Sequence, residues 1–112
     1  MHLWSARAAN SVFGVGYVDY AALNEGILDT TRDALVRNIG GRLIGERSLV
    51  QAGLTGRGFE ARSGERLLRA RLLVSGSRLY QIAILGNGDA VTPADAELFL
   101  SSFVPLPPGR PD

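Results

Sequence analysis

Hydrophobic and polar positions alternate between residues 58 and 85 in three runs of strand length. Short turns rich in glycine and serine, at 63–65 and 75–77, separate the runs. Runs of this length joined by such turns are typical of an antiparallel meander. The pattern therefore predicts three consecutive antiparallel strands in this part of the chain.

The same periodicity predicts further strands outside the meander. Residues 12–20 alternate aromatic and β-branched side chains, which favours a strand despite two glycines. Residues 3–9 are a weaker strand candidate. Residues 42–52 alternate again, and we expect residues 53–56 to form the turn that leads into the meander.

Two helices are predicted, one before and one after the strand region at residues 42–85. The first is capped by the Asp29 carboxylate and ends at Gly40 and Gly41, where glycine commonly terminates a helix. The second begins with Thr92 as N-cap and Pro93 at its first position. The apolar side of the second helix comprises Leu98, Phe99, Leu100 and Phe103.

These elements predict an α+β fold. We expect an antiparallel β-sheet of about five to six strands with two helices packed on it, in the order β-β-α-β-β-β-β-α. A chain of 112 residues corresponds to one domain. We place that domain at residues 1–104 and expect the proline-rich residues 105–112 to form an unstructured tail.

Composition excludes several classes of protein. The chain has no cysteine, so disulfides and cysteine-based metal sites are excluded. The net charge is only +1, which argues against nucleic acid or an anionic membrane as a partner. All twelve basic residues are arginine, a bias that reflects a GC-rich genome more often than phosphate recognition. No signal peptide or membrane-spanning stretch is recognisable, and the compartment stays open.

Catalytic and metal-binding patterns are weak, and we predict no catalytic, cofactor-binding or metal-binding residue. His2 is the only histidine and lies at the terminus, where it cannot be held rigidly as a general base. The carboxylate pairs Glu46 with Glu60 and Asp95 with Glu97 can be named, but helix-dipole stabilisation explains the second pair better. Asn87, Asp89 and Asp95 are oxygen donors without the spacing of a calcium loop.

Glycine-rich segments do not predict a phosphate-binding loop. The glycines at 40–45 have part of a Walker spacing, but Glu46 and Arg47 replace the lysine and hydroxyl residue, and a strand follows instead of a helix. We interpret these glycines as turn and packing residues.

Arginines on the predicted sheet form the best candidate binding surface. Alternation places Arg69 and Arg71 on one face of a strand, with Glu60 and Arg62 on the neighbouring strand. This face, marked by Arg62, Arg69 and Arg71, is a candidate site for an anion or a protein partner. The alternative is a solvated face of cross-strand Glu–Arg pairs, each contributing about 0.2–1 kcal/mol.

Trp4 is the exception among the aromatic residues, most of which we expect in the core. An indole near a chain terminus indicates an incomplete strand, a contact with another chain, or a cover over the edge of the core. We therefore keep Trp4 as a candidate dimer contact.

Several segments together resemble bacterial domains akin to the PsbP/Mog-like fold, in which helices flank a central antiparallel sheet. The resemblance extends over about residues 12–104 and rests on turn, core and helix-end patterns. The segments are Tyr17-Val-Asp-Tyr20, Asn38-Ile-Gly-Gly41, Leu43 to Arg47, Gly53-Leu-Thr-Gly56-Arg-Gly58-Phe-Glu60, Arg69-Ala-Arg71, Arg78-Leu-Tyr80-Gln-Ile and Ala96 to Phe103.

The resemblance implies a binding or accessory module whose relatives dock on larger assemblies or small GTPases and are often exported or attached to the envelope. It carries over no functional residue. Such domains usually open with an additional hairpin, so Met1 would lie inside the ancestral domain. Loss of that hairpin would expose a sheet edge and favour dimerisation.

The functional prediction from sequence is a non-catalytic binding or accessory module for a protein or a small amphiphile, without a cofactor. Two alternatives remain open: an enzyme with a carboxylate-based site, and a dimerising structural fragment. The expected partner is a protein or a second copy of the chain, with no nucleic acid and no membrane span.

Overall fold

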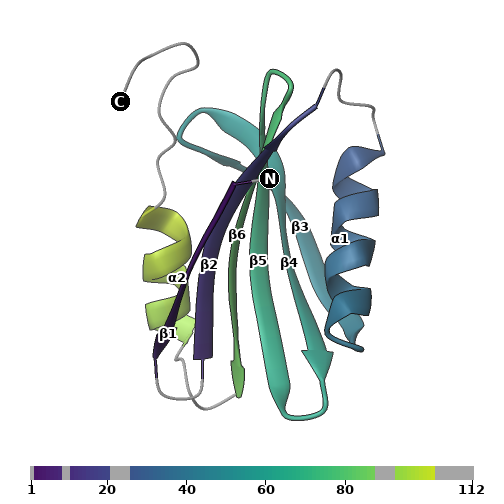
Figure 1. Ribbon diagram of the computed structural model, residues 1–112, viewed down its shortest axis with the longest axis vertical. Helices are drawn as coiled ribbons and strands as arrows, with labels where there is room; N and C mark the ends of the chain where they lie inside the picture. The colour runs from purple at the N-terminus through teal and green to yellow at the C-terminus, as the bar shows by residue number, and fades with distance from the viewer. Residues whose placement is uncertain (1, 9–10, 21–25, 88–92, 103–112) are drawn as a thin grey trace.

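The computed structural model describes residues 2–8, 11–20, 26–87 and 93–102. Two helices lie on either side of a sheet of long strands (Figure 1). In chain order the elements are β1 (His2–Ala8), β2 (Ser11–Asp19), α1 (Ile27–Asn38), β3 (Arg42–Gln51), β4 (Leu54–Ser63), β5 (Arg66–Ser75), β6 (Arg78–Asn87) and α2 (Pro93–Ser102).

The six strands form one antiparallel sheet in the order β1-β2-β6-β5-β4-β3. The run from β3 to β6 is a meander, because each strand pairs with the next along the chain. The hairpin of β1 and β2 then adds to the free side of β6, where Tyr17 lies opposite Tyr80. This last pairing joins segments that lie far apart in the sequence.

Two-residue turns set the length of the meander strands. Ala52 and Gly53 both have positive φ, 52° and 78°, as a type I′ turn requires. Gly64 and Gly76, with φ of 62° and 60°, are the first residues of the other two turns, as in type II′ turns. Such tight turns leave almost no loop, so each meander strand continues for 10 residues. The predicted turn over 53–56 is therefore wrong, because β4 already begins at Leu54.

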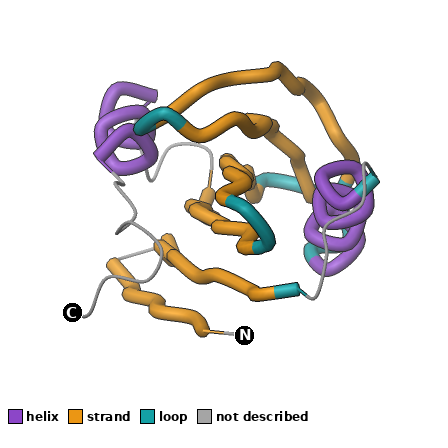
Figure 2. Tube along the Cα trace, turned by 90° about the horizontal axis from the view of Figure 1, so that it is seen from above, coloured by secondary structure: helices purple, strands orange, loops and turns teal. Residues whose placement is uncertain are grey.

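The two helices cover opposite faces of the sheet, and Figure 2 shows the strands curving between them. Under α1, the buried core comprises Phe59, Ala61, Leu68, Ala70, Leu72 and Leu79. On the α2 side, the buried cluster comprises Leu73, Tyr80, Ile82, Ile84, Ala96 and Leu100. Strand residues alternate between these two clusters because successive side chains point to opposite faces.

The predicted fold class requires a correction in the relative amounts of strand and helix. The structure is mainly sheet: four strands have 10 residues each, whereas the helices have only 12 and 10. The helices do not cover the sheet as a layer. The main contacts of α1 are with β3 and β4, and those of α2 are with β5 and β6.

The predicted start of the first helix is also wrong. Gly26 occupies the N-cap position of α1 and supplies no side-chain cap, so Asp29 lies inside the first turn. From there its carboxylate favours the positive end of the helix dipole and contacts Arg57 on β4. The helix begins earlier than predicted because the backbone N–H of Thr30 already donates to the carbonyl oxygen of Gly26, at 2.9 Å.

The second helix begins at Pro93, the position predicted for its first residue. Thr92 and Phe103 lie outside the described residues. Leu100 is buried and Phe99 half-buried, but the Leu98 side chain is 72% exposed. The apolar side of α2 is thus narrower than predicted, because only one stripe of this helix faces the sheet.

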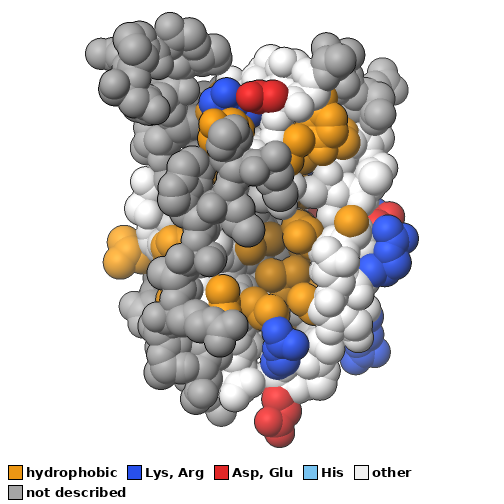
Figure 3. Space-filling model, in the orientation of Figure 1, with side chains coloured by type: hydrophobic (Ala, Val, Ile, Leu, Met, Phe, Trp, Pro, Cys, Tyr) orange, Lys and Arg blue, Asp and Glu red, His pale blue; other side chains and the backbone are white. Residues whose placement is uncertain are grey.

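Apolar side chains also gather in the middle of the face seen in Figure 1, with arginine and acidic side chains towards its margins (Figure 3). Half-buried residues packed against the α1-side core include Ala83 and Leu85 of β6. Since α1 lies mainly over β3 and β4, it leaves this part of the sheet only partly covered.

Candidate functional site

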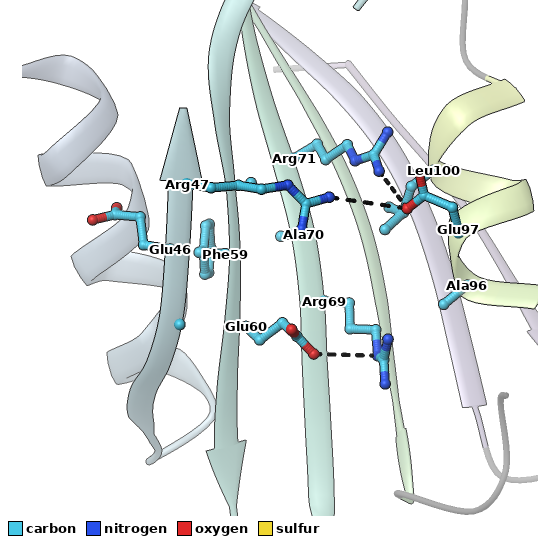
Figure 4. Close-up of a pocket in the computed structure, with 12 residues that line it drawn as sticks. Glu46, Arg47, Phe59, Glu60, Arg69, Ala70, Arg71, Ala96, Glu97 and Leu100 are labelled. Carbon is cyan, nitrogen blue, oxygen red and sulfur yellow. Dashed lines mark hydrogen bonds and ion pairs between the residues drawn. The ribbon is translucent and has the colours of Figure 1, made fainter. Parts of the chain in front are cut away.

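A cavity of about 190 Å³ lies between the β3–β4–β5 part of the sheet and α2 (Figure 4). We call it the α2 cavity. Its lining residues are Gly45, Glu46, Arg47, Gly58, Phe59, Glu60, Arg69, Ala70, Arg71, Ala96, Glu97 and Leu100. Small residues on three elements leave this space open, and arginines surround it.

Gly58 leaves the wall of the cavity without a side chain next to its central arginine. It lies directly opposite Arg71 in the β4–β5 ladder. A Cβ at this position would lie 2.9 Å from the Leu49 side chain and 3.8 Å from Cγ of Arg71. The absence of a side chain at Gly58 therefore makes room for Leu49, while the Arg71 side chain extends from β5 towards α2 (Figure 4).

Among the described residues, Arg71 is the charged residue that is buried, with only 6% of its surface exposed. Its Nη1 donates to Gln51 Oε1 at 2.7 Å and to Ser101 Oγ at 3.2 Å, while Nη2 donates to Glu97 Oε2 at 2.5 Å. Its Nε is buried as well, but has no hydrogen-bond partner within the described part of the chain. An unsatisfied buried donor is costly, so its presence in a folded protein calls for an explanation, such as a site for a ligand.

Gln51 connects the two walls of the site. It accepts from Arg71 and, through Nε2, donates to the carbonyl oxygen of Leu100 at 2.7 Å. β3, β5 and α2 are therefore joined by polar contacts at one end of the α2 cavity. This network holds the Arg71 guanidinium in a fixed orientation.

Two further arginines have loose ionic contacts. Arg47 Nη2 lies 4.0 Å from Glu97 Oε2, and the Arg47 side chain is 64% exposed. Arg69 Nε lies 3.5 Å from Glu60 Oε2 (Figure 4). Both distances exceed those of good charge-assisted hydrogen bonds, so both guanidinium groups retain donors for another acceptor.

The α2 cavity has an excess of positive charge. Arg47, Arg69 and Arg71 face two carboxylates, Glu60 and Glu97. Glu46 does not contribute its charge, because its side chain points away from the cavity in Figure 4 and binds Arg32 on α1 at 2.7 Å. Among the described side chains, three cations against two anions leave one unbalanced positive charge.

The electrostatics of Glu97 follow from the same contacts. The hydrogen bond from the Arg71 guanidinium, followed by the hydrogen bond from the Ser101 hydroxyl, holds the pKa of Glu97 below its usual value. The carboxylate is therefore ionised at neutral pH. Its side chain nevertheless remains 59% exposed, so it lies at the mouth of the cavity.

A second ionic cluster lies on the opposite face and has a structural role. Arg32 of α1 and Arg57 of β4 share the Glu46 carboxylate, and Arg57 also binds Asp29. The hydrogen bond from Arg57 lowers the pKa of Asp29, and the bond to Glu46 raises the pKa of Arg32. These pairs fasten α1 to β3 and β4.

The arginine face predicted from the sequence is divided in the structure. Arg69 and Arg71 share a sheet face and line the α2 cavity, with Glu60 across from Arg69. Arg62 does not line the cavity. It is exposed and lies opposite Arg42, beyond an irregularity in the β3–β4 pairing between Leu43 and Gly45.

The candidate carboxylate pair Glu46 and Glu60 is not brought together. Glu46 binds arginines on the α1 side, whereas Glu60 faces Arg69 on the α2 side. Alternation along adjacent paired strands causes this separation. The side chain of Asp95 and the whole of Asp89 lie outside the described residues, and the described part contains no group of three or more acidic or histidine side chains that could hold a metal ion.

Trp4 belongs to β1 and lies opposite Val15 of β2. The structure does not describe its side chain, so its role as a dimer contact stays a prediction. Over the described ranges, neither helix has the length and apolar character needed to cross a membrane.

Sequence reasoning missed Gln51, Glu97 and Ser101 as members of the site. The sequence suggests Glu97 only as a carboxylate paired with Asp95, which stabilisation of the helix dipole explains better. The signal available was its four-residue spacing from Ser101, which places both side chains on one helix face, and Ser101 Oγ donates to Glu97 Oε1 at 3.0 Å. Nothing in the sequence pairs Gln51 with either residue.

No protein-family model matches the chain, and no curated protein matches it in sequence. Among solved structures, it is similar to PA94 from Pseudomonas aeruginosa, a protein of unknown function described as a suggested regulator. The TM-score is 0.60 at 14% sequence identity, and the match covers 95% of this chain and 83% of PA94. At that identity the similarity shows the shared fold alone.

Proposed function

We propose that this protein is a non-catalytic binding module whose ligand occupies the α2 cavity. The observation that carries the proposal is the buried Arg71, held by Gln51, Ser101 and Glu97 and retaining an unpartnered Nε. A preorganised buried cation in a concave site is suited to recognising a polar group of a ligand.

The surroundings of Arg71 favour binding over catalysis. Arginine stays protonated at all physiological pH values, so it cannot exchange protons as a general acid or base. The carboxylates near it are paired with arginines and separated from Glu46 by the sheet. The name given to PA94 agrees with a regulatory or accessory role, and the kinship with PsbP/Mog-like domains stays a prediction.

A substitution that fills the α2 cavity tests this function. Gly45 lines the cavity, and a Cβ built on it meets nothing within 4 Å, so Gly45→Leu places an apolar side chain there without a backbone clash. Ser48→Leu adds the same side chain to β3 on the opposite face and serves as the matched control.

The measurement is a backbone amide NMR screen with small neutral, anionic and cationic compounds. We expect compounds that bind the wild type to shift the amides of the cavity residues, to leave Gly45→Leu unshifted and to bind Ser48→Leu as they bind the wild type. The proposal is overturned if no compound shifts cavity amides, or if Gly45→Leu binds as well as the wild type while remaining folded.

Self-association is a second candidate, favoured by the β3 edge. This strand ends the sheet and exposes Leu43, Ile44 and Val50 by 40%, 49% and 69%. Exposed apolar residues on an edge strand are a common route to pairing between chains. A second copy of the chain is the partner that this edge would bind.

A further inference from the structure

We propose that the α2 cavity recognises a carboxylate group, which replaces Glu97 on the Arg71 guanidinium. This inference rests on the proposed binding function and specifies the chemistry of the ligand. It depends on the unused donors of the cavity, on its charge and on its size.

The unused donors lie on three arginines. Within the described ranges the Nε of Arg71 has no partner, while the ionic contacts of Arg47 and Arg69 are at 4.0 and 3.5 Å. The Nε–H of an arginine and one N–H of Nη2 lie along the same edge of the guanidinium and fit the two oxygens of a carboxylate. At present Glu97 contacts Nη2 of this edge with only one oxygen, because its other oxygen accepts from Ser101.

Of the side chains that bind the Arg71 guanidinium, Glu97 is the one that a ligand can displace most easily. Its side chain is 59% exposed, whereas that of Arg71 is 7% exposed. When Glu97 rotates into water, the incoming carboxylate takes over its charge on Arg71, so the buried guanidinium is not left without a counter-ion. Gln51 and Ser101 would continue to hold Nη1, so Arg71 keeps its orientation when Glu97 moves.

The charge of the cavity fits a monoanion. In the part of the lining that the structure describes, three arginines and two glutamates leave one positive charge, which one carboxylate neutralises. A carboxylate that reaches Nε also satisfies the buried donor that Glu97 leaves unpaired.

The volume fits a small group. At about 30 Å³ for each water in the liquid, 190 Å³ corresponds to roughly six waters, which is below the range of pockets for drug-sized ligands. A short carboxylic acid or the carboxyl end of a peptide fits this space, with Ala96 and Leu100 of α2 lining its apolar part.

The test uses the full chain labelled with ¹⁵N and titrated with propionate, with the neutral isostere propionamide as the matched ligand. We expect saturable shifts of the Arg71 side-chain Nε–H resonance and of the Glu97–Leu100 amides with propionate, and none with propionamide. Inorganic sulfate is titrated in parallel. Binding of sulfate or propionamide in place of propionate overturns the carboxylate assignment.

Variants separate displacement of Glu97 from adventitious binding. Glu97→Gln removes the competing charge and should strengthen propionate binding roughly threefold to tenfold, whereas Arg71→Met should weaken it by about tenfold or more. Glu65→Gln removes the same charge from the exposed β4–β5 turn and should change the affinity by less than about twofold. Unchanged or weaker binding in folded Glu97→Gln overturns the proposal even if Arg71→Met does not fold.

Titrations with two peptides distinguish a peptide carboxyl terminus from a small carboxylic acid as the ligand. Acetyl-Gly-Ala with a free carboxyl end is compared with its amide. Stronger binding of the free acid than of propionate supports a peptide terminus, and equal or weaker binding supports a small acid. If neutral compounds fill the cavity in the earlier screen but propionate does not bind, the carboxylate assignment fails while the proposed binding function stands.

Discussion

Arg71 illustrates how far residue patterns determine a site. Alternation places it on the same sheet face as Arg69, as the sequence predicted. The pattern could not show that Arg71 is buried, because burial depends on α2 lying over this face. The difference matters energetically, since a buried guanidinium without partners is far more costly than an exposed one.

Arg78 is held in the same way by neighbours on another strand. It donates to both carboxylate oxygens of Asp19, at 2.6 and 3.0 Å, and its Cζ lies 4.0 Å from the centroid of the Tyr17 ring. The Asp19 carboxylate, which lies opposite it in the β2–β6 ladder, raises the pKa of Arg78. The sequence identified these side chains individually, but the pairing of β2 with β6 brings them together.

At the residue scale, Glu97→Gln should make stability less dependent on pH. The pKa of Glu97 is lowered in the folded state, so its stabilising contribution is present above the unfolded value near 4.5 and is lost as pH falls through the lower folded value. We expect the variant to be less stable at pH 7 by about 0.5–1 kcal/mol, a modest figure because the carboxylate is largely exposed.

Urea unfolding at pH 7, 5 and 3 measures this effect. The difference between wild type and Glu97→Gln should shrink as pH falls through the acid range. A difference that stays constant from pH 7 to pH 3 would show that the ionised carboxylate does not contribute, and Glu65→Gln provides the charge-matched control.

At the scale of elements, tight turns and close strand approach determine the sheet. The turn glycines were recognisable in the sequence because type I′ and II′ turns require positive φ. Gly56 is different, because its role depends on a neighbouring strand. A Cβ there would lie 1.9 Å from the carbonyl oxygen of Leu72, so β4 and β5 can keep this approach only without a side chain.

Gly56→Ala should therefore destabilise the protein by about 1–3 kcal/mol, because the backbone of β4 or β5 must shift. Gly45→Ala is the matched control, since its Cβ meets nothing within 4 Å. We expect the control to be neutral or up to about 1 kcal/mol more stable, through loss of unfolded-state freedom. Chemical unfolding of both variants measures the difference in their free energies of unfolding. If both substitutions change stability equally, close strand approach does not explain the glycine at position 56.

At the scale of the whole molecule, the sheet has two open edges, β1 and β3. The sequence predicted an exposed edge and a dimer contact at Trp4 of β1. In the described side chains, the apolar exposure is instead concentrated on β3, where Val50 is 69% exposed. β3 is also the meander strand with neighbours on only one side.

If β3 mediates self-association, Val50→Lys should convert a dimer to a monomer, because a buried lysine opposite a second copy is strongly unfavourable. Leu98→Lys on α2 replaces a similarly exposed apolar residue and should leave the dimer intact. Size-exclusion chromatography with light scattering at micromolar concentration gives the mass, and a monomeric wild type would exclude this candidate.

The sequence by itself determined the local features of this protein: the alternation of the strands, the turn glycines of the meander and the start of α2 at Pro93. These depend on backbone geometry within a few residues. Only the tertiary structure decided the partners, because β2 meets β6, and Gln51 meets Arg71 and Glu97, across long stretches of chain. Side-chain periodicity specifies which face a residue occupies, but packing of distant elements decides whether that face is buried, charged and able to bind.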